Sequence, residues 1–246
     1  FKSKNRWGTT VLYGFVLQGS CIRIEGFKIT HTNGGWFGGG IWLSAHNVKI
    51  VNNYIYDVPG QGISPNWSGD NYWSNIYIAS NHIFRCGKGL IAKGCNWLVE
   101  FNNIERIVCH PENPEDADYT RFFGSNIVFR YKLLHGTKKE EIGSNSHTDG
   151  FQTYNTTNAL EFAVNILFEF NYIGGFFHQG LIARRITPES IKKLIFRNNI
   201  VDSPASWCIL LEVDGITVKN NIFFNGEING VGYRNGLRVL LKTTLL

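Results

Sequence analysis

The chain has 246 residues, 43% of them hydrophobic, which is enough to bury a sizeable core without disulfides or metals. Only 17% are charged, while glycine reaches 27 residues and aromatics 14%, a balance that excludes disorder and favours a turn-rich β protein. The net charge of +5 favours polyanionic partners, but the basic residues are scattered, which argues against nucleic-acid binding.

Cysteine usage and hydropathy exclude further classes of protein. The five cysteines are an odd number and none forms a CxxC pair, which argues against a disulfide framework and a zinc knuckle, and favours buried small hydrophobes. No apolar run approaches the roughly 18 residues that cross a bilayer, so we expect no membrane insertion. The chain opens at Phe1 without a signal peptide and lacks methionine. We expect one domain over residues 1–246 that belongs to a longer protein, with terminal coils or caps missing.

A motif of eight residues recurs along the chain, apolar at positions one, three and eight and usually Asn at position six. Its copies begin at Ile22, Val48, Ile76, Trp97, Ile127, Ile166, Leu194 and Ile216. Apolar residues two apart form one face of a strand, so each copy predicts a short strand with a buried inner face. Their irregular spacing does not fit propeller blades or helical arrays.

The residue at position six predicts a ladder of stacked amides. It is asparagine in most copies, namely Asn53, Asn81, Asn102, Asn171, Asn199 and Asn221, and the exceptions are Phe27 and Lys132. Asparagine tolerates left-handed backbone geometry, and its amide bonds to neighbouring backbone. We therefore expect a structural role for these residues at one corner of the stacked coils.

A second strand recurs between the cores, usually after a glycine. It starts at Gly40, Gly62, Gly89, Gly150 and Gly180, and without glycine at Trp207. Together the strands predict an all-β, single-stranded, right-handed parallel β-helix of about eight or more coils, whose flank suits an extended polymer. Leucine-rich repeats are the rival architecture, but the L-x-x-L element that precedes their core is missing.

The N-N-x-I cores, the G-I-x-L strands and the segment SHTDGFQ at residues 146–152 resemble the pectate-lyase-like superfamily over roughly residues 20–225. The resemblance implies a right-handed β-helix and a carbohydrate-related function. Because that superfamily includes lyases, hydrolases, epimerases and phage tailspikes, it does not identify the reaction. Its lyases often use Lys or Arg as base and calcium as neutraliser, and this sequence lacks a complete lyase signature.

The leading candidate site lies in the longest interval between cores, which also carries Glu140 and Glu141. Strand alternation would expose His147 and Asp149 together, with Gln152 nearby on the other face. A histidine beside a carboxylate can act as general base, and the carboxylate can bind calcium. The structural alternative is that Thr148 and Asp149 only organise a turn.

One coil later, His178 and Gln179 are expected level with Thr148 and Asp149. Arg184 and Arg185 follow, and either can bind the carboxylate of an acidic sugar or neutralise it before proton abstraction. For each arginine alone, simple surface solvation is the competing explanation.

Further polar and aromatic residues are expected along the same flank as substrate-binding groups. Gln61, Lys88, Asp149 and Gln179 would form one line, with Lys93 nearby and Trp42 and Trp67 available to stack on sugar rings. Such a line suits an anionic glycan, which also implies secretion. The acidic loop from His110 to Asp118 is interpreted as a solvated insertion.

Three functions remain open. The first is a polysaccharide lyase that abstracts a proton beside a uronate carboxylate, with His147, His178 or a lysine as base and Arg184 or calcium stabilising the intermediate. The second is a glycoside hydrolase, which needs two facing carboxylates. Glu140 or Glu141 could reach Asp149 from the loop, but no adjacent-coil Asp pair appears in the second strands, so this ranks lower. The third is a non-catalytic glycan-binding or tailspike-type β-helix. Oligomeric state has no signal in the sequence.

Overall fold

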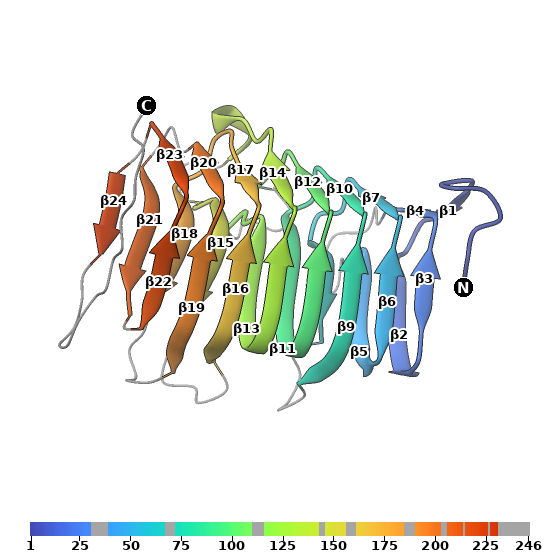
Figure 1. Ribbon diagram of the computed structural model, residues 1–246. Coiled ribbons are helices and arrows are strands. Elements are labelled where there is room, and N and C mark those ends of the chain that lie inside the picture. Colours follow the sequence, from blue (N-terminus) through green and yellow to red (C-terminus); the bar gives the residue numbers. More distant parts are fainter. Residues whose placement is uncertain are drawn as a thin grey trace.

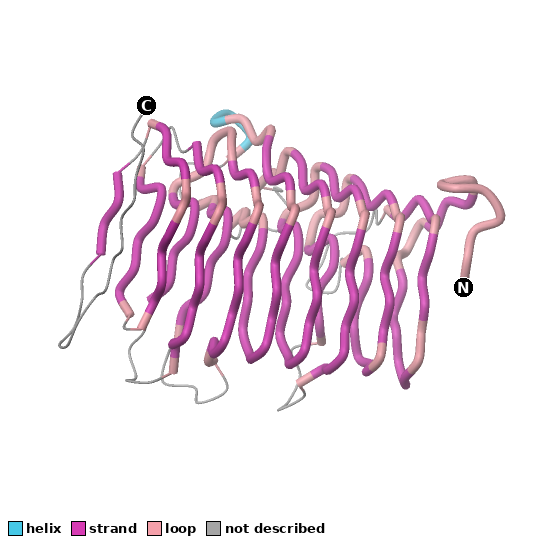
Figure 2. Tube along the Cα trace, viewed as in Figure 1, coloured by secondary structure: helices cyan, strands magenta, loops and turns pink. Residues whose placement is uncertain are grey.

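The computed structural model describes residues 1–30, 39–66, 72–109, 116–142, 146–155, 161–184, 190–202, 206–213, 215–225 and 227–230. The chain winds through short strands that stack coil upon coil from the N-terminal to the C-terminal end (Figure 1). Every strand pairs in parallel with the equivalent strand of the next coil, and Figure 2 shows loops and turns joining the strands within each coil. The predicted all-β parallel β-helix is confirmed.

Each coil contributes to three faces. Face 1 contains β2 (Phe15–Ser20), β5 (Ile41–His46), β8 (Gln61–Pro65), the first parts of β11 (Lys88–Glu100) and β13 (Thr120–Arg130), β15 (Asp149–Tyr154), β18 (Gln179–Arg184), β21 (Trp207–Glu212) and β24 (Glu227–Gly230). Face 2 contains β3 (Arg23–Glu25), β6 (Val48–Val51), β9 (Trp73–Ala79), the second parts of β11 and β13, β16 (Ala163–Glu169), β19 (Ile191–Arg197) and β22 (Ile216–Lys219).

Face 3 is built from the shortest strands. It contains β1 (Thr9–Val11), β4 (Phe27–Ile29), β7 (Tyr54–Tyr56), β10 (His82–Phe84), β12 (Asn103–Glu105), β14 (Leu133–His135), β17 (Tyr172–Ile173), β20 (Ile200–Asp202) and β23 (Ile222–Phe224). A short 3₁₀ helix, η1 (Lys139–Glu141), follows β14 and is the cyan segment of Figure 2.

The predicted cores stack in register on face 2. Their first residues are paired from coil to coil, as in Val48 with Ile76, Ile76 with Trp97, and Trp97 with Ile127. The later copies continue the same row through Ile166, Leu194 and Ile216. The apolar periodicity thus predicted the register of the coils as well as the strands.

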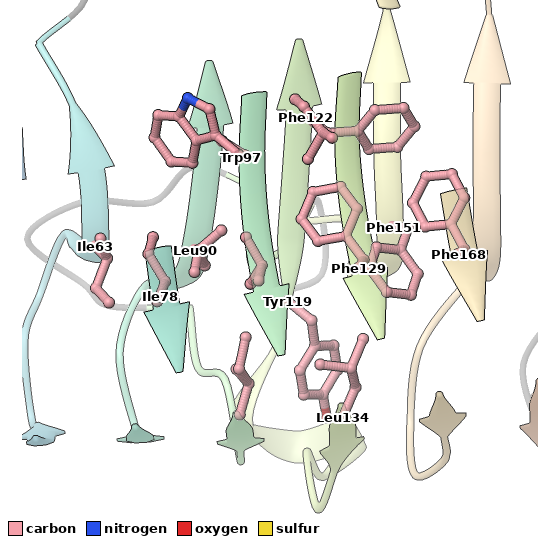
Figure 3. Close-up of a cluster of buried hydrophobic side chains, with 14 of the residues drawn as sticks. Ile63, Ile78, Leu90, Trp97, Tyr119, Phe122, Phe129, Leu134, Phe151 and Phe168 are labelled. Carbon is pink, nitrogen blue, oxygen red and sulfur yellow. The ribbon is translucent and has the colours of Figure 1, made fainter. Parts of the chain in front are cut away.

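The interior is a continuous apolar column whose centre is aromatic (Figure 3). The rings of Phe129 and Phe168 stack with centroids 5.3 Å apart, and Phe122 and Phe151 meet Phe168 edge-on at 5.0 and 4.8 Å. All four side chains are fully buried, and each burial stabilises the fold by roughly 1.5 to 3 kcal/mol. The cysteines are unpaired, and the expectation that they are buried holds for some but not for Cys21, which is exposed.

The predicted asparagine ladder runs along the corner between faces 2 and 3. The side-chain amide of Asn53 donates to Asn81 Oδ1 at 3.0 Å, and that of Asn81 donates to Asn102 Oδ1 at 2.9 Å. After an interruption at Lys132, the ladder resumes with the links from Asn171 to Asn199 and from Asn199 to Asn221. Each amide also bonds to backbone, so the ladder satisfies polar groups inside the corner.

A second ladder, which the sequence analysis did not predict, lies on the surface at the corner between faces 1 and 2. Its members all have left-handed backbone geometry, with φ between 55° and 60°, and are Asn47, Asn75, Asn96, Asn126 and Asn165. Their side-chain amides are linked in series at 2.7 to 3.4 Å. Asparagine accepts this backbone geometry at lower cost than most residues, which explains its recurrence there.

Candidate active site

Polar residues occupy the start of successive face 1 strands, where the chain turns in from face 3. Gln61 pairs with Lys88, and Asp149 pairs with Gln179, which itself pairs with Trp207. The predicted line of residues is therefore confirmed, but it is incomplete. An additional coil lies between Lys88 and Asp149.

Asp118 supplies the missing member of this row. The N–H of Asp149 donates to Asp118 Oδ1 at 3.0 Å, and the N–H of Tyr119 donates to the carbonyl of Asp149 at 2.8 Å, which places the two acidic residues side by side. The sequence interpretation that Asp149 has no acidic partner in an adjacent coil is thus wrong. So is the assignment of Asp118 to a solvated insertion, because its side chain is buried.

The sequence pattern does not indicate Asp118, because its strand lacks the glycine that precedes most other face 1 strands. Tyr119 stands where the neighbouring coils have glycine, at Gly89 and Gly150. The available signal was the apolar pair Phe122 and Phe123, which stands shortly before the core at Ile127.

Arg121 is the positive partner of this acidic group. Its Nε lies 2.6 Å from Asp118 Oδ2, and its terminal nitrogen lies 3.3 Å from Asp116 Oδ2. Burial raises the pKa of Asp118, and the Arg121 guanidinium opposes that rise by stabilising the ionised form. The arginine therefore favours a carboxylate at Asp118.

Asp149 is held by two hydrogen bonds and has a different electrostatic environment. Its Oδ1 accepts from the N–H of Gln179, and its Oδ2 accepts from the side-chain amide of Gln152, both at 3.0 Å. Burial, and next the nearby charge of Asp118, raise the pKa of Asp149 well above its usual value. The pKa of both carboxyl groups is thus raised, that of Asp149 well above its usual value, and Asp118 is the one that forms an ion pair with Arg121.

The predicted joint exposure of His147 and Asp149 is wrong, because only His147 is exposed. Regular alternation fails at this corner of the coil. A Cβ added to Gly150 would meet Ile173 Cγ2 in the interior at 2.8 Å, and the next residue, Phe151, also faces the core. Because Gly150 and Phe151 both face the interior, the side chain of Asp149 points out of the coil, where neighbouring residues cover it.

The two histidines lie beside the acidic group. Their rings are 5.0 Å apart, and the N–H of His147 donates to Asp116 Oδ1 at 3.1 Å. His178 Nδ1 accepts from the N–H of Thr148 at 3.1 Å, which confirms the predicted alignment of these coils. Burial and the nearby His147 lower the pKa of His178, which favours the neutral ring.

Several buried oxygen atoms on this flank lack a hydrogen-bond partner. They are Oε1 of Gln61, Gln152 and Gln179 and Oγ of Thr148, on the row itself or directly beside it. Buried polar atoms are normally satisfied, so a cluster of free acceptors suggests that ligand donors complete it.

Of the other predicted residues, Lys88 stands next to Asp118 in the row, because Leu90 pairs with Thr120. Arg184 lies at the far end of β18, is 58% exposed, and pairs with Glu212 at 2.7 Å. Lys88 and Lys93 are buried, and Lys93 Nζ lies 5.8 Å from the centre of the Tyr72 ring. Trp42 is partly buried on β5.

Two predicted residues, Trp67 and Arg185, lie outside the described residues. The two glutamates considered as partners for Asp149, Glu140 and Glu141, lie in η1. Of these, Glu141 forms an ion pair with Arg106, which holds the pKa of Glu141 below its usual value.

Calcium binding at Asp149 remains a prediction. The described residues contain no group of three or more His, Cys, Asp or Glu side chains arranged to hold a metal ion. Oxygen donors at hand are the Asp149 carboxylate and the free amide oxygens of Gln152 and Gln179. A cation there would have to displace the Gln152 N–H from Asp149 Oδ2. In the same part of the chain, no helix is long and apolar enough to cross a membrane.

The sequence matches the model of a known protein family. Residues 10–157 match the family described as protein of unknown function (DUF1565), which covers more than half of the sequence. The chain belongs to the DUF1565 family. No curated protein matches this DUF1565 chain.

Solved structures share the fold of the DUF1565 chain. A GH136 lacto-N-biosidase from Eubacterium ramulus superposes with a TM-score of 0.58 at 15% identity, over 97% of this chain and 46% of that one. A DFA-IIIase from Arthrobacter chlorophenolicus A6, solved in complex with GF2, gives 0.51 at 11% identity, over 89% and 58%. At such low identity the likeness concerns the fold, and the DUF1565 chain spans about half the length of either structure.

Proposed function

We propose that this DUF1565 chain is the β-helix of a glycoside hydrolase in which Asp149 and Asp118 form the catalytic pair of carboxyl groups. The observation that carries the proposal is their adjacency: two acidic side chains start neighbouring strands in register, and Arg121 binds only one of them. Glycosidases need one protonated and one ionised carboxyl group at the scissile bond. The lacto-N-biosidase among the solved neighbours, a glycosidase by name, supports this reading.

The roles follow from the two environments. Asp149, with its raised pKa, donates a proton to the glycosidic oxygen, while ionised Asp118 faces the positive charge that develops on the sugar. One coil separates the two residues, a rise of about 4.8 Å.

Gln152 controls access to the acid. Its amide covers Asp149 Oδ2, and its own Oε1 has no partner. Rotation of Gln152 on substrate binding would free Asp149 Oδ2 and direct the amide oxygen to a sugar hydroxyl.

The lyase expected first from the sequence becomes the second candidate. Arg184, its proposed neutralising group, is bound to Glu212 at the far end of the strand. An acidic glycan partner and secretion remain predictions from composition and fold resemblance.

The test compares wild type with Asp149→Asn and Asp118→Asn on neutral oligosaccharides and on uronate polymers. We expect new reducing ends without ultraviolet absorbance from unsaturated sugar, and a loss of about 10³-fold in kcat for each variant. Asp57→Asn is the matched control, because Asp57 pairs with Arg85 at the surface. Unsaturated products would overturn the proposal in favour of a lyase. No turnover of any glycan would favour a binding module.

A further inference from the structure

The coil that carries Asp118 and Arg121 has an unusual interior, beginning with Lys132. This residue occupies a ladder position, and its N–H still donates to Asn171 Oδ1 at 3.1 Å. The side chain, only 1% exposed, turns into the core, where Nζ donates to Thr120 Oγ1 at 2.7 Å. Nζ also lies 5.1 Å from the ring centres of Phe129 and Phe151. A lysine amine thus replaces an amide and crosses the interior to face 1.

Thr120 is an exception in its own row. The equivalent inward positions of the other face 1 strands hold apolar side chains, namely Ile41, Ile63, Leu90, Phe151, Leu181 and Ile209. The hydroxyl and the Lys132 amine therefore depart from the repeat together and satisfy each other.

Tyr119 is a third exception, at the corner between faces 3 and 1. Five other coils have a glycine here whose added Cβ would meet a methyl group of a β-branched residue on face 3 at 2.5 to 2.8 Å; those residues are Ile55, Ile83, Ile104, Ile173 and Val201. The coil of Tyr119 has Leu134 there instead, which lacks the β-branch (Figure 3). The same coupling recurs at Cys208, whose coil has Phe223.

The space made at this corner is used for a hydrogen bond. Tyr119 Oη donates to Thr137 Oγ1 at 2.6 Å and accepts from the N–H of Thr137 at 3.1 Å. Thr137 Oγ1 in turn donates to the carbonyl of Ile107 at 3.1 Å, on the preceding coil. The hydroxyl group of Tyr119 is therefore held by Thr137, which is itself bonded to the preceding coil.

These exceptions have an energetic cost that the rest of the solenoid avoids. Burial alone lowers the pKa of Lys132 well below its usual value, which shows how poorly the site accommodates charge. In neighbouring coils, the positions of Lys132, Thr120 and Tyr119 are occupied mostly by asparagine, apolar residues and glycine, respectively. Departures from a repeat that cost stability are expected where function requires a particular geometry.

Tyr119 and Thr120 are the two residues between Asp118 and Arg121. We propose that Lys132 and Tyr119 are positioning residues, which fix the backbone of this segment from inside the coil and so set the Asp118–Arg121 ion pair on its outer side. The inference rests on the proposed function and deepens it, because it explains why this coil alone among the described ones has a polar interior of this kind.

The test restores the repeat at this coil with the double variant Lys132→Asn, Thr120→Val. The new asparagine can rejoin the ladder, and valine matches the apolar row, so the protein is expected to fold with an unchanged or higher Tm. Loss of the internal tether should lower kcat about 10- to 100-fold with little change in KM, because small displacements of reacting groups are costly. Asn53→Ala, three coils away in the ladder, is the control: it should lower Tm and leave kcat unchanged.

A second readout does not depend on turnover. Carboxyl carbon NMR titration follows Asp118 and Asp149 directly, and the double variant should change both midpoints, whereas Asn53→Ala should change neither. Unchanged midpoints together with an unchanged kcat would overturn the positioning role. If wild type hydrolyses no glycan, the proposed function fails, and the titration alone then decides whether Lys132 positions the acidic pair.

Discussion

The N–H of Asp149 donates a 3.0 Å hydrogen bond to Asp118 Oδ1, and the N–H of Gln179 repeats this relationship with Asp149 Oδ1. Each acidic side chain therefore caps the strand that starts the next coil. The β-helix itself sets the separation of the two carboxyl groups, because both are fixed to the backbone ladder rather than to flexible side chains. Preorganisation of this kind is what acid–base catalysis requires.

Arg121→Gln should change the pH dependence of hydrolysis. The guanidinium, 2.6 Å from Asp118, opposes the rise in the pKa of that carboxyl, so its removal raises the pKa further. Activity that needs ionised Asp118 then declines at a higher pH on the acidic side, and kcat at the optimum falls roughly tenfold or more.

The pH profile of kcat/KM in both proteins is the measurement for this prediction. Arg197→Gln is the control, because Arg197 forms a similar ion pair with Glu169 on face 2. If kcat/KM of the variant fell by the same factor at every pH, without a shift of the acidic limb, the role assigned to Arg121 would be contradicted.

Asp149→Asn should stabilise the fold at neutral pH while it lowers kcat about 10³-fold. The pKa of Asp149 is raised in the folded state, so the native protein holds a proton that the unfolded chain releases above about pH 4. The stability that this group contributes is full below about pH 4 and is lost as pH rises through the folded pKa. Asparagine stays neutral and can bond to the free Gln152 Oε1 after that amide rotates.

Urea unfolding of wild type and Asp149→Asn between pH 4 and 8 measures this effect. The variant should gain stability over wild type as pH rises, and the difference should vanish at the acidic end. A difference that does not depend on pH would mean that Asp149 is ionised in the folded protein.

Asn81→Ala should cost about 2 to 4 kcal/mol of unfolding free energy. Asn81 Oδ1 accepts from both the backbone and the side chain of Asn53, and its amide donates to the carbonyl of Ile50 and to Asn102. Each such bond contributes about 1 kcal/mol, and the partners left behind are buried.

Chemical denaturation checks this value against Asn75→Gly in the surface ladder. Glycine keeps the left-handed geometry of Asn75, whose amide bonds are exposed, so that variant should change stability by less than about 1 kcal/mol. Equal losses in the two variants would show that burial does not distinguish the ladders.

The architecture could be predicted from the sequence because each coil of the solenoid has to bury the same kind of strand and turn. Apolar residues two apart and an asparagine near the next turn identified the strands that now pair in register, from Val48 to Ile216. Even the alignment of Gln179 with Asp149 followed from the spacing of the glycine corners.

The acidic pair was missed for the same reason. Asp118 lies in the coil that departs from the repeat at Tyr119, so a search for the repeated pattern passed over it. The exposure of Asp149 was also misjudged, because strict alternation does not allow for two successive inward residues at a corner. A repeat identifies the scaffold, whereas its exceptions mark the site.

The inner ladder is interrupted at Lys132, and its side-chain amide links fall into two groups. Asn53, Asn81 and Asn102 tie the coils on one side, while Asn171, Asn199 and Asn221 tie those on the other, with Lys132 joined to the second group through its N–H. The interruption coincides with the longest strand pairing of the described residues, β11 with β13, and with the ion pair between Glu100 and Arg130. Backbone pairing therefore holds the coil of Lys88 to the coil of Asp118 where the amide link is missing.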